Sequence, residues 1–335
     1  MSHTWMNGPV SLHHTMNPEA THPTVSCIIV NYETSSFVSR CVASLRNSVT
    51  ESINIEIIVV DNPSQAHDIE NLRSLPIDIL VSSDSNVGYG IACNLGRKSA
   101  HGDYICILNP DTVVNPQTIE FWVKSFRELS ASQPDLALLA PTLINENETE
   151  QRSTYHFLSP LNYWAYHSLI AGCLKKFRKS VRIETKKKSS RFLRVDWAMG
   201  AAYLVKSEAW NTVQGFSDKF FMYAEDQDLC KRLQEHGYSI WQSTQLRILH
   251  TQGEPSAEGR ASGIIRFFDG LSRYIRIHYS LGGRISIRMQ IICDMTLRIL
   301  FLSVLRVTNW HSIMTRNRIR GYCAVFGTTI KTLFQ

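Results

Sequence analysis

The sequence of 335 residues lacks the features of a cysteine-built scaffold or a membrane span. Its eight cysteines are scattered without a C-x-x-C pair, which disfavours a zinc cage or a disulfide framework and favours a reducing compartment. The longest apolar stretch, residues 285–305, is interrupted by Arg288, Asp294 and Arg298, so we expect no transmembrane helix. Residues 1–23 have no apolar core, and we expect a flexible tail there and not a signal peptide.

The chain also has no glycine-rich loop after its first predicted strand. That position reads NYETSSF, residues 31–37, and contains no glycine. A G-x-G-x-x-G dinucleotide site is therefore disfavoured. A sugar nucleotidyltransferase is an alternative that this loop also disfavours, because such enzymes open with a Gly-rich, Arg-containing loop.

The formal net charge of +6 is modest, but the charge is unevenly distributed. Residues 175–194 hold ten Lys or Arg against one acid, and residues 260–320 hold eleven Arg against two acids. Each segment carries +9, so the remainder is close to −12. This pattern indicates an anionic substrate or surface as partner. We expect no nucleic acid, because no recognition motif accompanies the basic segments.

Short apolar runs alternate with helix-like stretches through the first 142 residues, which predicts an α/β fold with a parallel sheet covered on both faces. The runs are residues 25–31, 55–61, 77–82, 103–111 and 135–141. Such sheets bind ligands beyond the carboxyl ends of their strands. The polar residues that end the first four runs should therefore meet at one edge: Asn31, Asp61 with Asn62, Ser82 to Asn86, and Asn109 to Asp111.

A single acid ends the fourth run, in the sequence N-P-D. Asp111 follows Pro110, and the position two residues before it is Asn109. Mg²⁺ prefers oxygen ligands and commonly takes one or two protein carboxylates together with substrate phosphates. Asp111 therefore suits a metal-bridged nucleoside diphosphate, although a solvated turn aspartate would have the same sequence.

Two other segments also have both a ligand-binding and a structural interpretation: the end of the run 55–61 and the glycines after the run 77–82. Asp61 and Asn62 can accept and donate hydrogen bonds to a nucleobase, or they can form an Asx turn. Gly88 and Gly90 precede a predicted helix, where backbone can approach a ligand closely and the helix N-terminus favours phosphate.

Two further candidates lie in the second half of the chain. Glu225 and Asp226, with Asp228 nearby, begin a predicted helix. They provide either a general base or acids that complement the helix dipole. His250 ends a strand-like run, where it is either a metal ligand or a structural residue.

Taken in order, these segments resemble the family 2 glycosyltransferases, inverting enzymes of the GT-A fold. The resemblance covers residues 24–257 through VSCIIVNYET, IIVVDNPS, NVGYGIACNLG, ILNPDTVV, FFMYAEDQDLCKRL and ILHTQGEPS. N-P-D and the E-D-x-D-L segment look most similar to the rhamnosyltransferase-type members. That subgroup uses dTDP-activated deoxysugars in cell-surface polysaccharide biosynthesis.

The resemblance implies a role for each matching residue. Asp226 would be the catalytic base, with Glu225 supporting the acceptor side. Asp111 would be the surviving acid of the family's D-x-D motif and would hold Mg²⁺ or Mn²⁺ near His250. The nucleotide-sugar-binding residues would be Asn31, Asp61, Asn62, Asn86 and Gly88.

The implied function is transfer of rhamnose or another deoxyhexose from a nucleotide-diphosphate donor to a lipid-linked or polysaccharide acceptor. Asn109 departs from the family pattern, because it replaces the first acid of D-x-D. That change predicts weaker metal binding, and it leaves open an inactive, transferase-like scaffold.

We expect three parts: the tail 1–23, a GT-A domain 24–257 divided near residue 142 into nucleotide-binding and acceptor halves, and a basic helical region 258–335. In a helix from Arg288, the residues Asp294, Arg298 and Arg306 share an arc of about 120°. Such a helix could lie on anionic lipid or pack against the catalytic domain. We expect a cytoplasmic protein, peripheral on the inner face of the cytoplasmic membrane.

Overall fold

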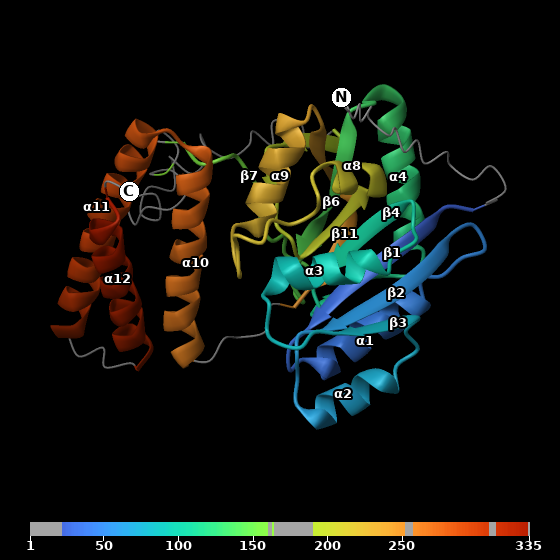
Figure 1. Cartoon of the computed structure of the whole chain (residues 1–335), viewed down its shortest axis with the longest axis horizontal. Helices are drawn as coiled ribbons and strands as arrows, with labels where there is room; N and C mark the ends of the chain where they lie inside the picture. The colour runs from blue at the N-terminus through green and yellow to red at the C-terminus, as the bar shows by residue number, and fades with distance from the viewer. Residues whose placement is uncertain (1–21, 160–162, 164–189, 252–256, 308–312, 334–335) are drawn as a thin grey trace, which may run out of the picture.

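A mixed sheet with helices on both faces forms the larger part of the computed structural model, and three C-terminal helices stand beside it (Figure 1). The structure describes residues 22–159, 163, 190–251, 257–307 and 313–333. The predicted tail, apart from residues 22–23, and most of the basic segment 175–194 lie outside the described residues.

Four parallel strands form one half of the nine-stranded sheet. They are β1 (Thr24–Asn31), β2 (Asn54–Asp61), β3 (Ile79–Ser82) and β4 (Tyr104–Leu108). The register places Asn31 beside Asp61, and Asp61 beside Ser82. The predicted meeting of polar residues at one sheet edge is therefore confirmed for these strands.

The other half of the sheet is mixed, which the strand-and-helix rhythm did not predict. It contains β5 (Thr112–Val113), β6 (Leu136–Ile144), β8 (Phe192–Val195), β10 (Ala202–Lys206) and β11 (Ser239–His250). Strand β10 lies antiparallel between β4 and β6, so its first residue, Ala202, pairs with Leu108 at the carboxyl end of β4. The reversal brings Gly200, just before β10, to the same edge as the polar strand ends. Strands β7 (Thr154–Tyr155) and β9 (Trp197–Ala198) pair separately.

Helices cover both faces of the sheet, as the continuous apolar strands require. One face carries α1 (Ser35–Arg46), α2 (Ala66–Arg73) and α4 (Thr118–Ser132), and the other α3 (Tyr89–Lys98), α8 (Ser207–Thr212) and α9 (Glu225–Glu235). A separate hydrophobic core lies on each face of the sheet. Strand β1 contributes to both, because Cys27 and Ile29 point to the face with α1, α2 and α4, and Ile28 and Val30 point to the face with α3, α8 and α9. Each such side chain stabilises the fold by roughly 1.5–3 kcal/mol. The cysteines that the structure describes are free thiols.

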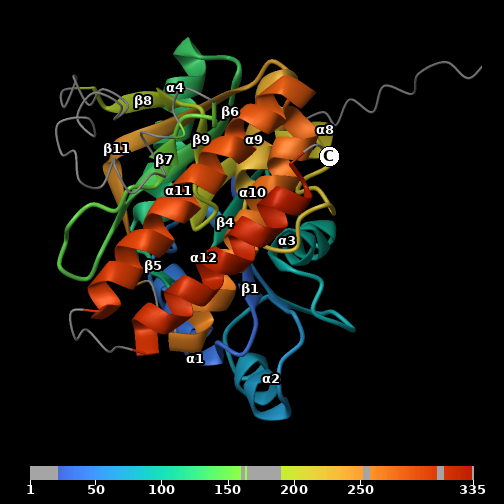
Figure 2. The ribbon, with the colours of Figure 1, turned by 90° about the vertical axis from the view of Figure 1, so that its left-hand side faces the viewer.

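The C-terminal helices are α10 (Ala257–His278), α11 (Leu281–Val307) and α12 (Ile313–Lys331). They share a core that includes Leu271, Ile275, Ile287, Met295 and Val325. Helix α10 lies toward the sheet, and α11 and α12 lie on its far side (Figures 1 and 2). Within the described part of the chain, no helix has the length and hydropathy needed to cross a membrane.

Helix α11 turns its charged arc inward. Asp294 is fully buried and accepts a hydrogen bond from Arg298 at 2.7 Å, and Arg288, 2% exposed, donates to the Thr332 carbonyl. The exposed residues of α11 include the large apolar side chains of Met289, Leu297, Leu300 and Phe301. The helical period of the sequence predicted which charged residues of α11 share one side, but it did not predict that this side is buried. The side chain of Arg306 lies outside the described residues.

Candidate active site

Two neighbouring cavities lie at the carboxyl edge of the sheet. The first, here called the edge cavity, has a volume of about 400 Å³ and is lined by the ends of β1, β2 and β4 together with Gly88 and Arg266. The second, the aromatic cavity, has a volume of about 490 Å³ and is lined by Glu225, Asp226 and several aromatic side chains. The segment 221–224 and helix α10 contribute residues to both.

Paired asparagines shape one wall of the edge cavity. The Asn62 amide donates to Asn86 Oδ1 at 3.1 Å, and Asn62 Oδ1 accepts from the Val87 N–H at 2.9 Å. Asn86 Oδ1 also accepts from the Gly88 N–H at 3.1 Å. These bonds fix the glycine turn against the end of β2. Asn62, Asn86 and Gly88 line one cavity, and their contact with a nucleotide stays a prediction.

Asn31 and Asp61 lie beneath this cavity and do not line it. Both are fully buried, and the Asn31 amide donates to Asp61 Oδ1 at 3.0 Å, Ser64 Oγ at 2.8 Å and Asp68 Oδ2 at 3.2 Å. Asn31 Oδ1 accepts a hydrogen bond from the N–H of Thr34, the residue before α1, so the same side chain also holds the start of that helix. In this structure they tie the ends of β1 and β2 together, and direct contact with a nucleobase stays a prediction.

Asp111 lines the edge cavity and faces His250, which does not itself line the cavity. His250 Nε2 lies 3.4 Å from Asp111 Oδ1 and 3.4 Å from the Asn109 amide nitrogen, and the ring is 7% exposed. Gln151 holds the ring from behind: its Oε1 lies 2.9 Å from Nδ1 and its amide donates to the His250 carbonyl at 2.6 Å. An Nδ1–H donated to Gln151 leaves the Nε2 lone pair aimed toward Asp111.

This pair fits a hard cation that completes its shell with substrate oxygens. Among the described residues, no group of three or more His, Cys, Asp or Glu side chains is placed to hold a metal. A carboxylate, an imidazole held by a supporting amide and an open cavity beside them are nevertheless the partial ligand set that Mg²⁺ or Mn²⁺ uses with a diphosphate. The geometry therefore agrees with the predicted metal residues without testing them.

The glycine turn connects the edge cavity to the segment that precedes α9 (Glu225–Glu235). Gly88 has φ +84° and opens α3, and a Cβ there would lie 2.1 Å from the Phe221 carbonyl oxygen. The next residue, Tyr89, donates its N–H to that same oxygen at 3.0 Å. Its hydroxyl donates to the Gly200 carbonyl at 2.9 Å. Only glycine permits this approach, so the turn and the segment before α9 are held together.

Asp226 and Glu225 begin α9 beside the aromatic cavity. The Asp226 carboxylate accepts from the Gly200 N–H at 3.0 Å and the Gln227 N–H at 2.7 Å. Burial raises the pKa of both carboxyls, and the negative charge of Asp226 raises the pKa of Glu225 further. Buried Glu225 Oε2 has no hydrogen-bond partner among the described residues. The Gly200 and Gln227 N–H donors favour the charged form of Asp226, whereas Glu225 Oε2 has no such donor among the described residues.

A strained backbone precedes these acids. Tyr223 and Ala224 both have positive φ, 68° and 66°. Each such non-glycine residue costs of order 1–3 kcal/mol and persists only where surrounding contacts enforce it. Helix α10 supplies one of these contacts, since a Cβ on Gly270 would lie 2.4 Å from the Tyr223 carbonyl oxygen. The C-terminal region therefore holds the turn that presents Asp226.

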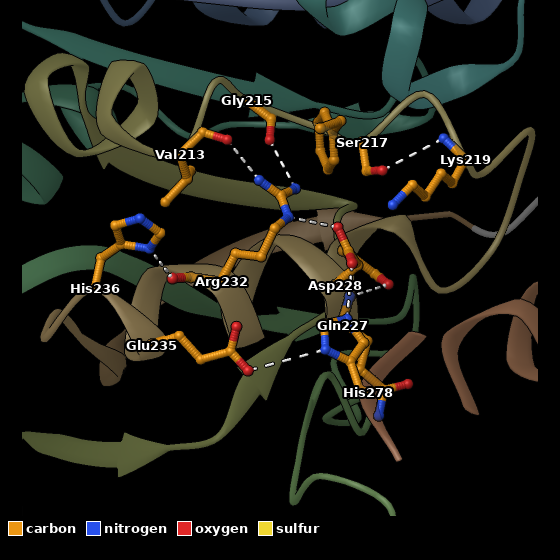
Figure 3. A network of polar contacts seen from close by, with 12 residues as sticks. Val213, Gly215, Ser217, Lys219, Gln227, Asp228, Arg232, Glu235, His236 and His278 are labelled. Carbon is orange, nitrogen blue, oxygen red and sulfur yellow. Dashed lines mark hydrogen bonds and ion pairs between the residues drawn. The ribbon is translucent and has the colours of Figure 1, made fainter. Parts of the chain in front are cut away.

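The third acid of the segment, Asp228, points away from both cavities into a polar network (Figure 3). Its carboxylate is 2% exposed and contacts Arg232 Nε at 2.7 Å and His278 Nε2 at 2.8 Å. Arg232 also donates to the carbonyls of Val213 and Gly215. Asp228 thus joins α9, the loop before it and the end of α10.

The sequence profile of Glycosyl transferase family 2 matches residues 26–199, about half of the chain. The chain belongs to glycosyltransferase family 2. It is therefore a glycosyltransferase, and the scaffold and nucleotidyltransferase alternatives are set aside.

Curated relatives include rhamnosyltransferases. An N-acetylglucosaminyl-diphospho-decaprenol L-rhamnosyltransferase from Mycobacterium tuberculosis is 24% identical over 301 residues, covering 81% of this chain and 93% of that protein. The rhamnosyltransferase WbbL from Escherichia coli is 25% identical over 153 residues, covering 46% of this chain and 54% of its own.

Solved structures confirm the GT-A-like fold. The mannosyltransferase PcManGT from Pyrobaculum calidifontis, in complex with GDP-Man and Mn²⁺, aligns with a TM-score of 0.55 at 13% identity, over 92% of this chain and 87% of that one. GalNAc-T7, solved with UDP, GalNAc and Mn²⁺, aligns with the same TM-score over 93% of this chain and 57% of that one. At this identity the likeness shows the fold alone.

The glycosyltransferase contains cavity residues that the sequence analysis missed. In the aromatic cavity, Tyr155 and Trp197 stack with ring centroids 4.5 Å apart, and the Arg152 guanidinium lies 4.6 Å from the Tyr155 centroid. Phe267 of α10 lines the same cavity. No motif marks these positions, because β7, β9 and α10 meet only through the fold. In the edge cavity the sequence analysis also missed Tyr32, which is 50% exposed. Its position directly after Asn31, at the end of the first predicted strand, could have indicated it.

Proposed function

We propose that this protein is an inverting glycosyltransferase that moves rhamnose or another deoxyhexose from a nucleotide-diphosphate donor, dTDP-linked by preference, to a lipid-linked or polysaccharide acceptor. The observation that carries this proposal is the pair of adjacent cavities, one with the asparagines and Asp111 and the other with the oriented carboxylate of Asp226. The names of the M. tuberculosis and E. coli relatives support the sugar, and the first supports a diphospholipid acceptor.

The reaction needs one displacement at the anomeric carbon. The acceptor hydroxyl would lie in the aromatic cavity and give its proton to Asp226 as its oxygen bonds to the anomeric carbon. The bond from that carbon to the diphosphate oxygen breaks on the opposite face, and the electron pair leaves with the nucleoside diphosphate. One attack from the face opposite the leaving group inverts the configuration. The Gly200 and Gln227 N–H groups orient the base and favour its charged form.

Asp111 and His250 would hold a divalent cation on the donor side, with Gln151 fixing the imidazole. Such an ion, when bound, neutralises charge on the departing diphosphate. The asparagines would hold the nucleoside part, and the half-exposed Tyr32 offers a ring face to its base.

We also propose peripheral attachment to the inner face of the cytoplasmic membrane, through the exposed apolar side of α11 and not through its charged arc. Met289, Leu297, Leu300 and Phe301 are exposed residues of α11, and this helix lies on the far side of α10 from the sheet (Figure 1). Flotation with liposomes containing anionic lipid tests this: the wild type should float and a Leu300→Ser/Phe301→Ser variant should not. A wild type that stays at the bottom of the gradient excludes this attachment.

A donor screen tests the proposed reaction. The protein is incubated with dTDP-, UDP- and GDP-sugars and a sugar-diphospholipid acceptor, with Mg²⁺, Mn²⁺ or chelator, and the released nucleoside diphosphate is measured. We expect turnover with a dTDP-deoxysugar, and we expect chelation of the divalent cation to lower that turnover. Turnover confined to another donor class would contradict the sugar assignment.

A further inference from the structure

Helix α10 forms part of the wall between the two cavities. Its consecutive residues Arg266 and Phe267 line different cavities, Arg266 the edge cavity and Phe267 the aromatic one. Consecutive helical residues point about 100° apart, so one turn of α10 serves both sides. The close contact of Gly270 with the Tyr223 carbonyl fixes the helix at this position.

Arg266 is the only Lys or Arg among the described residues that line the edge cavity, and Asp111 is the only acid there. Arg266 is exposed and makes no hydrogen bond or ion pair with another residue that the structure describes. Its neighbour on the same helix, Arg273, is already bound to Asp269 at 3.0 Å. An unengaged guanidinium in a cavity with Asp111 is placed to receive an anion.

From this geometry we propose that Arg266 binds the diphosphate of the donor, an inference that rests on the proposed function. A guanidinium presents paired N–H donors that match phosphate oxygens. Asn109 cannot offer a metal the charged ligand that an aspartate would, so a second cation on the diphosphate has more effect here. The negative charge that grows on the leaving oxygen is stabilised by a donor already in place. The C-terminal helices are thereby part of the donor site.

Calorimetric binding of dTDP, UDP and GDP, each compared with its monophosphate and without divalent metal, tests the proposal. For the nucleotide that binds the wild type best, Arg266→Gln should lower diphosphate affinity by roughly tenfold or more, as expected for a charge-assisted hydrogen bond. Monophosphate affinity should change much less, and Arg266→Lys should recover part of the loss. The control Arg276→Gln changes an exposed arginine of the same helix outside both cavities and should bind like wild type.

Two results would overturn the proposal, and they differ. If the wild type prefers a diphosphate and Arg266→Gln binds it equally well, Arg266 has no such role and the proposed function stands. If the wild type binds none of the three diphosphates, with or without Mn²⁺, the proposed function fails and the inference fails with it. Arg266 is exposed, so the variant should melt at the wild-type temperature, which confirms that any loss is local.

Discussion

His278, the last residue of α10, lies with its Nε2 2.8 Å from Oδ1 of Asp228 in helix α9. Both side chains are almost fully buried, 6% and 2% exposed. The contact fastens the C-terminal helices to the helix whose first turn contains Asp226. The acids of the E-D-x-D segment therefore have different surroundings: Asp226 lines the aromatic cavity, and Asp228 is buried in contacts that connect helices.

Replacing His278 with Ala should destabilise the protein and lower turnover together. The change leaves a buried carboxylate oxygen without its partner, which costs about 1–3 kcal/mol. Thermal melting and steady-state kinetics measure both effects. His236→Ala is the control, because His236 is exposed and directly follows the end of α9, the helix that contains Asp228. Equal melting temperatures for the two variants would show that the Asp228 contact contributes nothing.

Gly88→Ala should abolish donor binding and destabilise the fold. A methyl group at this position meets the Phe221 carbonyl oxygen at 2.1 Å, and the backbone has φ +84°. Gly237→Ala separates the two effects, because Gly237 has φ +85° but nothing within 4 Å of the added Cβ. We expect Gly237→Ala to cost about 1 kcal/mol from strain alone and to leave activity intact. Similar chemical-denaturation midpoints for both variants would contradict the close-contact argument.

Tyr89→Phe should lower kcat roughly tenfold, because the lost hydrogen bond to the Gly200 carbonyl is worth about 1–3 kcal/mol when one buried partner is left unpaired. Gly200 donates its N–H to Asp226, so the loss acts on the orientation of the base and should change donor KM little. Tyr104→Phe, at a tyrosine on β4 outside both cavities, is the control. A lower melting temperature with unchanged kcat would reduce Tyr89 to a structural role.

Glu225→Gln should stabilise the protein increasingly as pH rises. The usual pKa of a glutamate is about 4.3, and the pKa of Glu225 is raised in the folded state. Above that pH the folded protein therefore binds more protons than the unfolded chain. Wild-type stability is therefore lost as pH rises toward the folded pKa, by up to about 1.4 kcal/mol per pH unit. The glutamine cannot ionise and escapes this loss.

Melting curves of the wild type and Glu225→Gln at pH 5, 7 and 8 measure the trend, with exposed Glu208→Gln as control. The difference from wild type should grow with pH for Glu225→Gln and stay constant for Glu208→Gln. A constant difference for both would mean that Glu225 titrates normally.

Much of the polar edge of the sheet could be predicted because parallel strands end together. Asn62, Asn86, Gly88 and Asp111 follow consecutive apolar runs, and their strand ends had to meet. Asn31 also ends a strand at this edge, yet the sequence could not show that its amide group is hydrogen-bonded to Asp61, Ser64 and Asp68 below the cavity. Burial and partner choice depend on neighbours that are distant in the chain.

The contribution of the C-terminal helices could not be predicted. Arg266 is 155 residues from Asp111 in the sequence and belongs to a helix with no motif. The strained turn at Tyr223 and Ala224 contains no glycine to reveal it. In α11 the period showed which residues share a side, but only packing against α12 decides which side is buried.

The central claim is that Asp226 is the base and that nucleotide binding is separate from it. The most direct measurement is transfer rate and donor affinity of Asp226→Asn, in the same buffer as the wild type. Removal of a general base should lower the transfer rate by at least about 100-fold, with donor affinity unchanged, because the edge cavity is intact. Transfer at the wild-type rate by Asp226→Asn would contradict the account.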